Sequence, residues 1–114
     1  MATWEDVREV AARLPEVEEG TLYRRPALRV RKKAFAWLSP HAPRALVLRC
    51  DPDERPLMIE ARPDVFWTSP HYAGYPMVLV NLETIDRREL ADRLEDSWAI
   101  AAPQLAPPAG GERR

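Results

Sequence analysis

From residue 20 to residue 49, apolar and polar side chains alternate with a period of two, as they do in a β-strand with one buried face. Leu28 and Val30 therefore point to one face of a predicted strand, and Arg29 and Arg31 point to the other. The connections within this segment are only a few residues long, whereas a parallel crossover needs about a dozen residues or more. The segment is thus predicted to form an antiparallel meander.

Two further strands and one turn complete the predicted sheet. Lys32 and Lys33 are predicted to form the turn between two strands of the meander. Residues 45–50 read as a further strand after a turn-rich stretch. Residues 77–82 are mostly apolar, and we expect them to form a central strand.

Three segments combine a polar N-cap, apolar residues near helical spacing and a terminating proline, which together predict helices. The predicted caps are Thr3, Asp51 and Asp86, and the terminating prolines are Pro15, Pro63 and Pro103. The apolar residues are Trp4, Val7, Ala11 and Leu14 in the first helix, Leu57, Met58 and Ile59 in the second, and Leu90, Leu94 and Trp98 in the third. The predicted fold is α+β, with an antiparallel sheet packed against N-terminal, middle and C-terminal helices.

The chain has 114 residues, which suits one domain. We predict a single domain over residues 1–102 and a disordered tail over residues 103–114, because the tail is rich in proline and glycine and lacks an apolar face. The N-terminus does not resemble a signal peptide, and no apolar run approaches the roughly 20 residues that cross a bilayer. The single cysteine, Cys50, cannot form an internal disulfide, which fits a reducing cytoplasm. We therefore expect a soluble, cytoplasmic protein that does not engage a membrane, and we expect it to be a monomer.

Few residues have the spacing that a catalytic or metal site requires. His41 and His71 fall in separate predicted loops, and together with Cys50 they do not form a zinc motif. The sequence has no glycine-rich phosphate loop and no serine or cysteine in a nucleophile motif. Cys50, at a strand end, is predicted to be a small buried hydrophobe. We therefore expect no metal, no cofactor and no enzymatic activity.

Positive charge is concentrated between residues 21 and 50, which hold eight basic residues and no acid, although the whole chain has a formal net charge of −1. A two-stranded ribbon fits a DNA groove, and clustered cations gain affinity from phosphates by releasing counterions. We predict weak DNA binding without sequence specificity. The alternative is that these residues are only the solvated face of a hairpin. The predicted contacts are Arg24, Arg25, Arg29, Arg31, Lys32 and Lys33.

The segment 66–76, here called the aromatic loop, is a second candidate site. It holds four rings that could line a pocket for a small molecule or a protein, namely Trp67, His71, Tyr72 and Tyr75. The alternative is that the rings of this loop fill the core and cover its rim.

A third candidate is an acidic ridge, because Glu16, Glu18 and Glu19 follow the first helix, whose own acids include Glu5 and Glu9. Such a ridge could bind cations or a basic partner. A solvated helix face explains the same pattern.

Several short motifs, in this order and spacing, resemble the MmcQ/YjbR family over about residues 4–105. The motifs are Glu18-Glu19-Gly20 leading into Arg29-Val30-x-x-Lys33-x-Phe35-Ala36, the loop Pro70-His71-Tyr72, and Ser97-Trp98. After the histidine loop the family often has a tryptophan entering the strand, where this chain has Pro76-Met77-Val78.

The resemblance implies a CyaY-like topology, similar to that of frataxin, with a double-wing arrangement of strands. The family is generally labelled as DNA-binding, which agrees with the charge pattern. One wing would be the hairpin that carries Arg29, Arg31, Lys32 and Lys33. Iron binding by frataxin's acidic helix is not implied, because the likeness to frataxin is one of fold alone.

Overall fold

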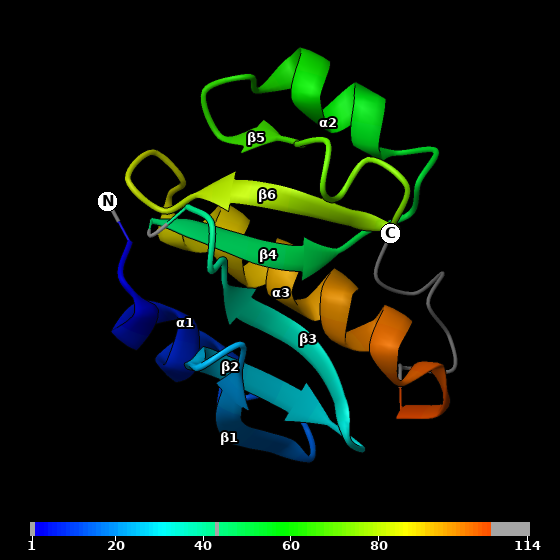
Figure 1. Cartoon of the computed structure of the whole chain (residues 1–114). Helices are drawn as coiled ribbons and strands as arrows, with labels where there is room; N and C mark the ends of the chain where they lie inside the picture. Colours follow the sequence, from blue (N-terminus) through cyan, green and yellow to red (C-terminus); the bar gives the residue numbers. More distant parts are fainter. Residues whose placement is uncertain (1, 43, 106–114) are drawn as a thin grey trace.

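A computed structural model of the chain describes residues 2–42 and 44–105. These residues form one six-stranded antiparallel sheet with three α-helices, so the predicted α+β class is confirmed (Figure 1). The elements are α1 (Trp4–Ala11), β1 (Val17–Leu22), β2 (Arg25–Val30), β3 (Lys33–Leu38), β4 (Ala45–Arg49), α2 (Arg55–Ala61), β5 (Phe66–Trp67), β6 (Met77–Asn81), α3 (Arg87–Ala101) and the 3-10 helix η1 (Pro103–Leu105).

The strands follow the order β1-β2-β3-β4-β6-β5, and each pairs with its neighbours in antiparallel fashion. The predicted meander is therefore confirmed, and β6 lies inside the sheet because the two-residue strand β5 pairs with its outer edge. Helices α1 and α3 lie behind the sheet in Figure 1, whereas α2 lies beyond β5. Strand β1 was not predicted, since its central residues Glu18-Glu19-Gly20 have little strand propensity.

Local caps define the ends of α1 and α3 as predicted. The Thr3 hydroxyl accepts a hydrogen bond from the Asp6 N–H, and the Asp6 carboxylate accepts one from the Thr3 N–H. The Asp86 carboxylate accepts a hydrogen bond from the Glu89 N–H at 2.8 Å. Both carboxylates also lie where the helix dipole favours negative charge.

The predicted cap of α2 was wrong. The helix begins at Arg55, and Asp51 instead closes the preceding turn by accepting a hydrogen bond from the Asp53 N–H at 2.8 Å. Pro56 explains the difference, because it lacks an N–H and is tolerated only in the first helical turn. A helix that started after Asp51 would place this proline in its interior.

The sheet has an apolar core on each face. The larger core lies between the sheet and the helices and includes Phe35, Leu48, Leu90, Leu94 and Trp98. The smaller core lies on the opposite face, where Tyr72 from the aromatic loop packs with Ala27, Trp37, Val47 and Leu79. Every central strand is therefore buried on both faces.

Ser97 connects α3 to an irregularity in the sheet. Leu28 pairs with Ala36 and Arg29 pairs with Ala34, so Phe35 is an extra residue that forms a bulge in β3. The Ser97 hydroxyl donates to the Phe35 carbonyl and accepts from the Arg49 N–H at 2.9 Å. The hydroxyl thus bridges the Phe35 carbonyl of β3 and the Arg49 N–H of β4, in place of a direct backbone hydrogen bond between the two strands at the bulge.

Both hairpins around β2 have two-residue turns without glycine. Tyr23 and Arg24 have φ values of 54° and 65°, and Arg31 and Lys32 have values of 49° and 71°. Two consecutive left-handed residues are typical of the type I′ turn, which matches the twist of the strands. The predicted Lys32-Lys33 turn was one residue too late, since Lys33 already pairs with Val30.

The folded part of the chain reaches beyond the predicted domain boundary. Residues 103–105, assigned above to a disordered tail, form η1, and Leu105 packs against the larger core. The rest of the predicted tail, residues 106–114, lies outside the described residues.

Candidate functional site

The six predicted phosphate contacts are distributed along β2 and its two turns. Arg24 lies in the turn before this strand, while Arg31 and Lys32 form the turn after it. Because β2 has six residues, the two turns are about 20 Å apart. The basic residues therefore form two groups at opposite ends of the strand and not one projecting tip.

Arg31 is bound to a carboxylate of this chain. Its guanidinium donates two hydrogen bonds to Glu16, at 3.0 and 3.2 Å. These bonds lower the pKa of Glu16 and raise the pKa of Arg31. The charge of Arg31 is thus largely compensated, although no acid occurs between residues 21 and 50. Strand β1 supplies a second acid, because Glu18 is paired in register with Arg29.

Arg25 and Arg29 are half-buried and donate to backbone carbonyls. Arg25 donates to the Ser39 carbonyl at 3.2 Å, and Arg29 donates to the Thr21 carbonyl at 2.9 Å. A Cβ at Gly20 would lie 2.9 Å from the Arg29 guanidinium, so the glycine makes room for this side chain. Arg25 thus links β2 to the end of β3, and Arg29 links β2 to β1.

Arg24, Lys32 and Lys33 differ from the other three basic residues. All three are exposed, and none makes an ion pair or side-chain hydrogen bond to any residue in 2–42 or 44–105. A ligand could therefore bind these three charges without breaking a contact within the protein. The structure thus separates the predicted set into three available cations and three that already have partners within the chain.

The four rings of the aromatic loop do not surround a common hollow. Tyr72 is only 5% exposed and belongs to the smaller core, whereas Tyr75 is 57% exposed. Trp67 is half-buried, and the exposed His71 ring packs edge-on against Tyr72 at 4.6 Å. The loop therefore acts mainly as a cover over the second face of the sheet. The Tyr72 hydroxyl is buried there without a protein partner.

Arg55 holds the aromatic loop in place, a role that the sequence analysis missed. Its guanidinium donates at 2.7–3.2 Å to the carbonyls of three loop residues, Tyr72, Ala73 and Tyr75, and of Met77, the first residue of β6. These partners are 17–22 residues away along the chain. Only the tertiary fold brings them to the first turn of α2, so no local pattern could have identified the contact.

The acidic ridge is occupied by arginines. Arg8 pairs with Glu5 and Glu19, and Arg87 pairs with Asp6 at 2.7 Å and with Glu9 at 3.0 Å. Within the described ranges, no group of three or more acidic, histidine or cysteine side chains could hold a metal ion. These ion pairs leave the ridge little unpaired negative charge.

Cys50 lies at the end of β4 and is 7% exposed, as predicted for a buried hydrophobe. Burial raises the pKa of its thiol, so the side chain stays protonated near neutral pH. Among the residues that the structure covers, no helix combines the length and apolar character needed to cross a bilayer.

Comparison with known proteins identifies related sequences and one related structure. The YjbR family matches this chain over residues 12–100. The uncharacterized proteins Rv2570 of Mycobacterium tuberculosis and Mb2600 of Mycobacterium bovis are each 31% identical to it over 121 residues, covering 91% of this chain and 92% of theirs. The crystal structure of Deinococcus radiodurans protein DR2400, with a DUF419 domain, superposes with a TM-score of 0.77 at 21% identity. The superposed region covers 99% of this chain and 88% of the DR2400 chain.

Proposed function

This chain belongs to the YjbR family, and we propose that it binds nucleic-acid phosphates weakly and without sequence specificity through the turns at the two ends of β2. The family resemblance drawn from the sequence motifs is thereby confirmed, and the function is our inference. We further propose that the protein acts as a cytoplasmic monomer without a catalytic role. The hairpins β1–β2 and β2–β3 would be its two wings.

The observation that carries this proposal is the availability of Arg24, Lys32 and Lys33. Each is exposed and makes no side-chain contact with an acid among the described residues, so binding a phosphate would break no ion pair. We leave Arg31 out of the proposed contacts, because its guanidinium already donates two hydrogen bonds to the Glu16 carboxylate. Arg25 and Arg29 would support the interface from within the strand.

The separation of the two turns suggests how the surface would meet a strand of nucleic acid. A spacing of about 20 Å corresponds to a rise of about six base pairs along the axis of a DNA duplex, since each pair advances by 3.4 Å. Three contacts predict a slope of about −3 for the logarithm of the affinity against the logarithm of the salt concentration on duplex DNA. The net charge of −1 opposes tighter non-specific binding.

Fluorescence anisotropy of labelled duplex and single-stranded DNA at several salt concentrations tests the proposal. The triple variant Arg24→Asn, Lys32→Asn, Lys33→Gln should lose measurable binding at low salt. Asparagine suits the left-handed conformation of the two turn positions, so the fold should be retained. The single variant Lys33→Gln should reduce the salt slope by about 1, whereas Arg88→Gln, an exposed control on α3, should not.

A gain-of-affinity variant makes the test sharper. Glu16→Gln should release Arg31 and strengthen binding, because it removes the carboxylate that compensates this guanidinium. Glu60→Gln, which removes an exposed acid on α2, controls for the same change in net charge. Absence of binding by the native protein at low salt, or an unchanged affinity in the triple variant, would refute the proposal.

A further inference from the structure

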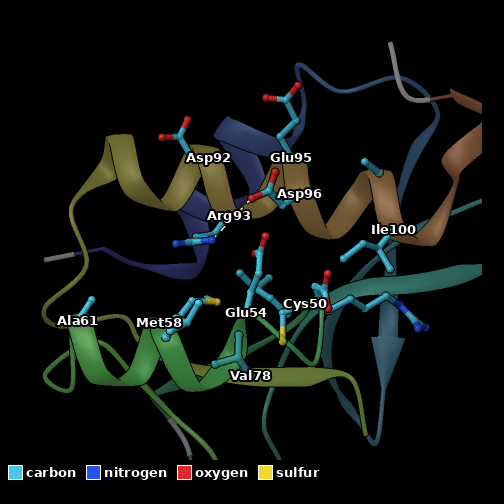
Figure 2. Close-up of a pocket in the computed structure, with 15 residues that line it drawn as sticks. Cys50, Glu54, Met58, Ala61, Val78, Asp92, Arg93, Glu95, Asp96 and Ile100 are labelled. Atoms are coloured by element: carbon cyan, nitrogen blue, oxygen red, sulfur yellow. Dashed lines mark ion pairs between the residues drawn. The ribbon is translucent and has the colours of Figure 1, made fainter. Parts of the chain in front are cut away.

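A groove separates α2 from α3 on the helical side of the molecule. Its volume is about 870 Å³, within the roughly 300–1,000 Å³ of typical ligand sites. Figure 2 shows the two helices running in opposite directions, with Met58 of α2 and Glu54, the residue before α2, pointing toward α3 and Arg93 of α3 pointing back. None of the six predicted phosphate contacts and none of the four rings of the aromatic loop lines this groove. It is therefore a separate candidate site.

The groove has an apolar floor and apolar side walls. Leu48, Met58 and Val78 form the floor and are at most 6% exposed. On the walls, Leu57 of α2 is 64% exposed and Ile100 of α3 is 42% exposed. Large aliphatic side chains that face solvent on both sides of a concave surface indicate a contact that the isolated chain does not make.

The rim of the groove is acidic. Its lining includes five carboxylates and two guanidinium groups, an excess of three negative charges, in a chain whose total charge is only −1. The acids are Asp51, Glu54, Asp92, Glu95 and Asp96. Both arginines already have partners within the protein. The Arg93 guanidinium lies 3.7 Å from the Asp96 carboxylate and over the Phe66 ring. The Arg49 guanidinium donates to the Ala34 carbonyl.

The charged and apolar residues follow the spacing of a helix face. Asp92, Glu95 and Asp96 of α3 lie three and four residues apart and continue into Ala99 and Ile100, so they share one stripe. That stripe spans about 12 Å at 1.5 Å per residue, which is a little over two helical turns. The trough between two roughly antiparallel helices accommodates a third helix along the same direction.

From this combination we infer that the groove binds a cationic amphipathic helix of a partner protein. Apolar side chains at three- and four-residue spacing in the partner would fill the floor between Leu57 and Ile100, and lysine or arginine on its flanks would meet the acidic rim. A polyanion is disfavoured by the rim, and the available cations of the β2 turns are not part of this groove. The inference does not depend on the proposed nucleic-acid function.

A synthetic amphipathic peptide of about four helical turns, with leucines on one face and lysines on both flanks, is the probe. We expect it to shift amide NMR signals of α2 and α3, and to bind at least about tenfold more tightly than a scrambled peptide of the same composition. An equal affinity for both peptides would overturn the inference, because it would mean that charge alone attracts them. Shifts confined to other elements would overturn it too.

Variants of the exposed walls connect the binding to the groove. Leu57→Ser and Ile100→Ser should each weaken peptide binding by about tenfold, while Tyr75→Ser, a control outside the groove whose exposure lies between those of the two wall residues, should not. Asp92→Asn should weaken peptide binding more than Glu60→Gln does, because Asp92 lines the groove and Glu60 does not. Unchanged affinity in both wall variants would refute the assignment. Concentration-dependent dimerisation that Leu57→Ser abolishes would assign the groove to a second copy and overturn it as well.

Discussion

Replacing Ser97 with alanine is expected to destabilise the protein by about 2–5 kcal/mol, an effect unusually large for the loss of one hydroxyl. The residue is fully buried, and its hydroxyl bonds both the Phe35 carbonyl and the Arg49 N–H. Alanine would leave two buried backbone groups without partners, and each unsatisfied group costs about 1–3 kcal/mol. The better helix propensity of alanine offsets about 0.5 kcal/mol of this loss.

Urea denaturation followed by circular dichroism measures this change. The midpoint should fall while the slope of the unfolding free energy against urea stays constant, and the melting temperature should drop by about 10 °C or more. Arg88→Ala, at an exposed position of the same helix, should change stability by less than about 0.5 kcal/mol. If Ser97→Ala is no more destabilising than this control, the hydroxyl does not replace a missing rung of the sheet and the reasoning fails.

Three further predictions concern the turns, one ion pair and the aromatic loop. Substituting Tyr23-Arg24 with Asn-Gly should stabilise the protein by about 1 kcal/mol in thermal unfolding, because both positions are left-handed; no gain would argue against the turn geometry. Glu16→Gln should destabilise the protein at neutral pH. Its bond from Arg31 lowers the folded-state pKa of Glu16, so the native advantage exists above the ordinary value of 4.5 and disappears as the pH falls through the folded-state value. A pH-independent difference between the two proteins would contradict this. Arg55→Lys should speed hydrogen exchange of the aromatic-loop amides by about tenfold or more, since one ammonium cannot reach four carbonyls; equal protection would rule out the clamp.

The pairing of Arg31 with Glu16 illustrates why the basic stretch was only partly predictable. A count of charges along the chain finds no acid between residues 21 and 50, and this suggests an uncompensated cationic ribbon. The acid that compensates Arg31 lies just before β1, whose pairing with β2 no local pattern predicted. The same strand also places Glu18 opposite Arg29. The three available cations could therefore be selected only after the register of the sheet was known.

The sequence alone determined the features that depend on neighbouring residues. The caps at Thr3 and Asp86, the antiparallel meander and the buried character of Cys50 all follow from signals within a few positions of one another, and the structure agrees with each of them. Such features are local because helix ends and tight turns satisfy their backbone groups with nearby atoms.

Only the tertiary structure decided which distant groups meet. The Ser97 hydroxyl reaches a carbonyl 62 residues away, and the Arg55 clamp and the groove between α2 and α3 also join segments that are separate in sequence. Each of these contacts depends on how elements far apart in the sequence pack together, and packing satisfies buried groups with whatever partner the fold brings near. For that reason the fold class could be predicted from the residues, whereas the candidate sites could be defined only in three dimensions.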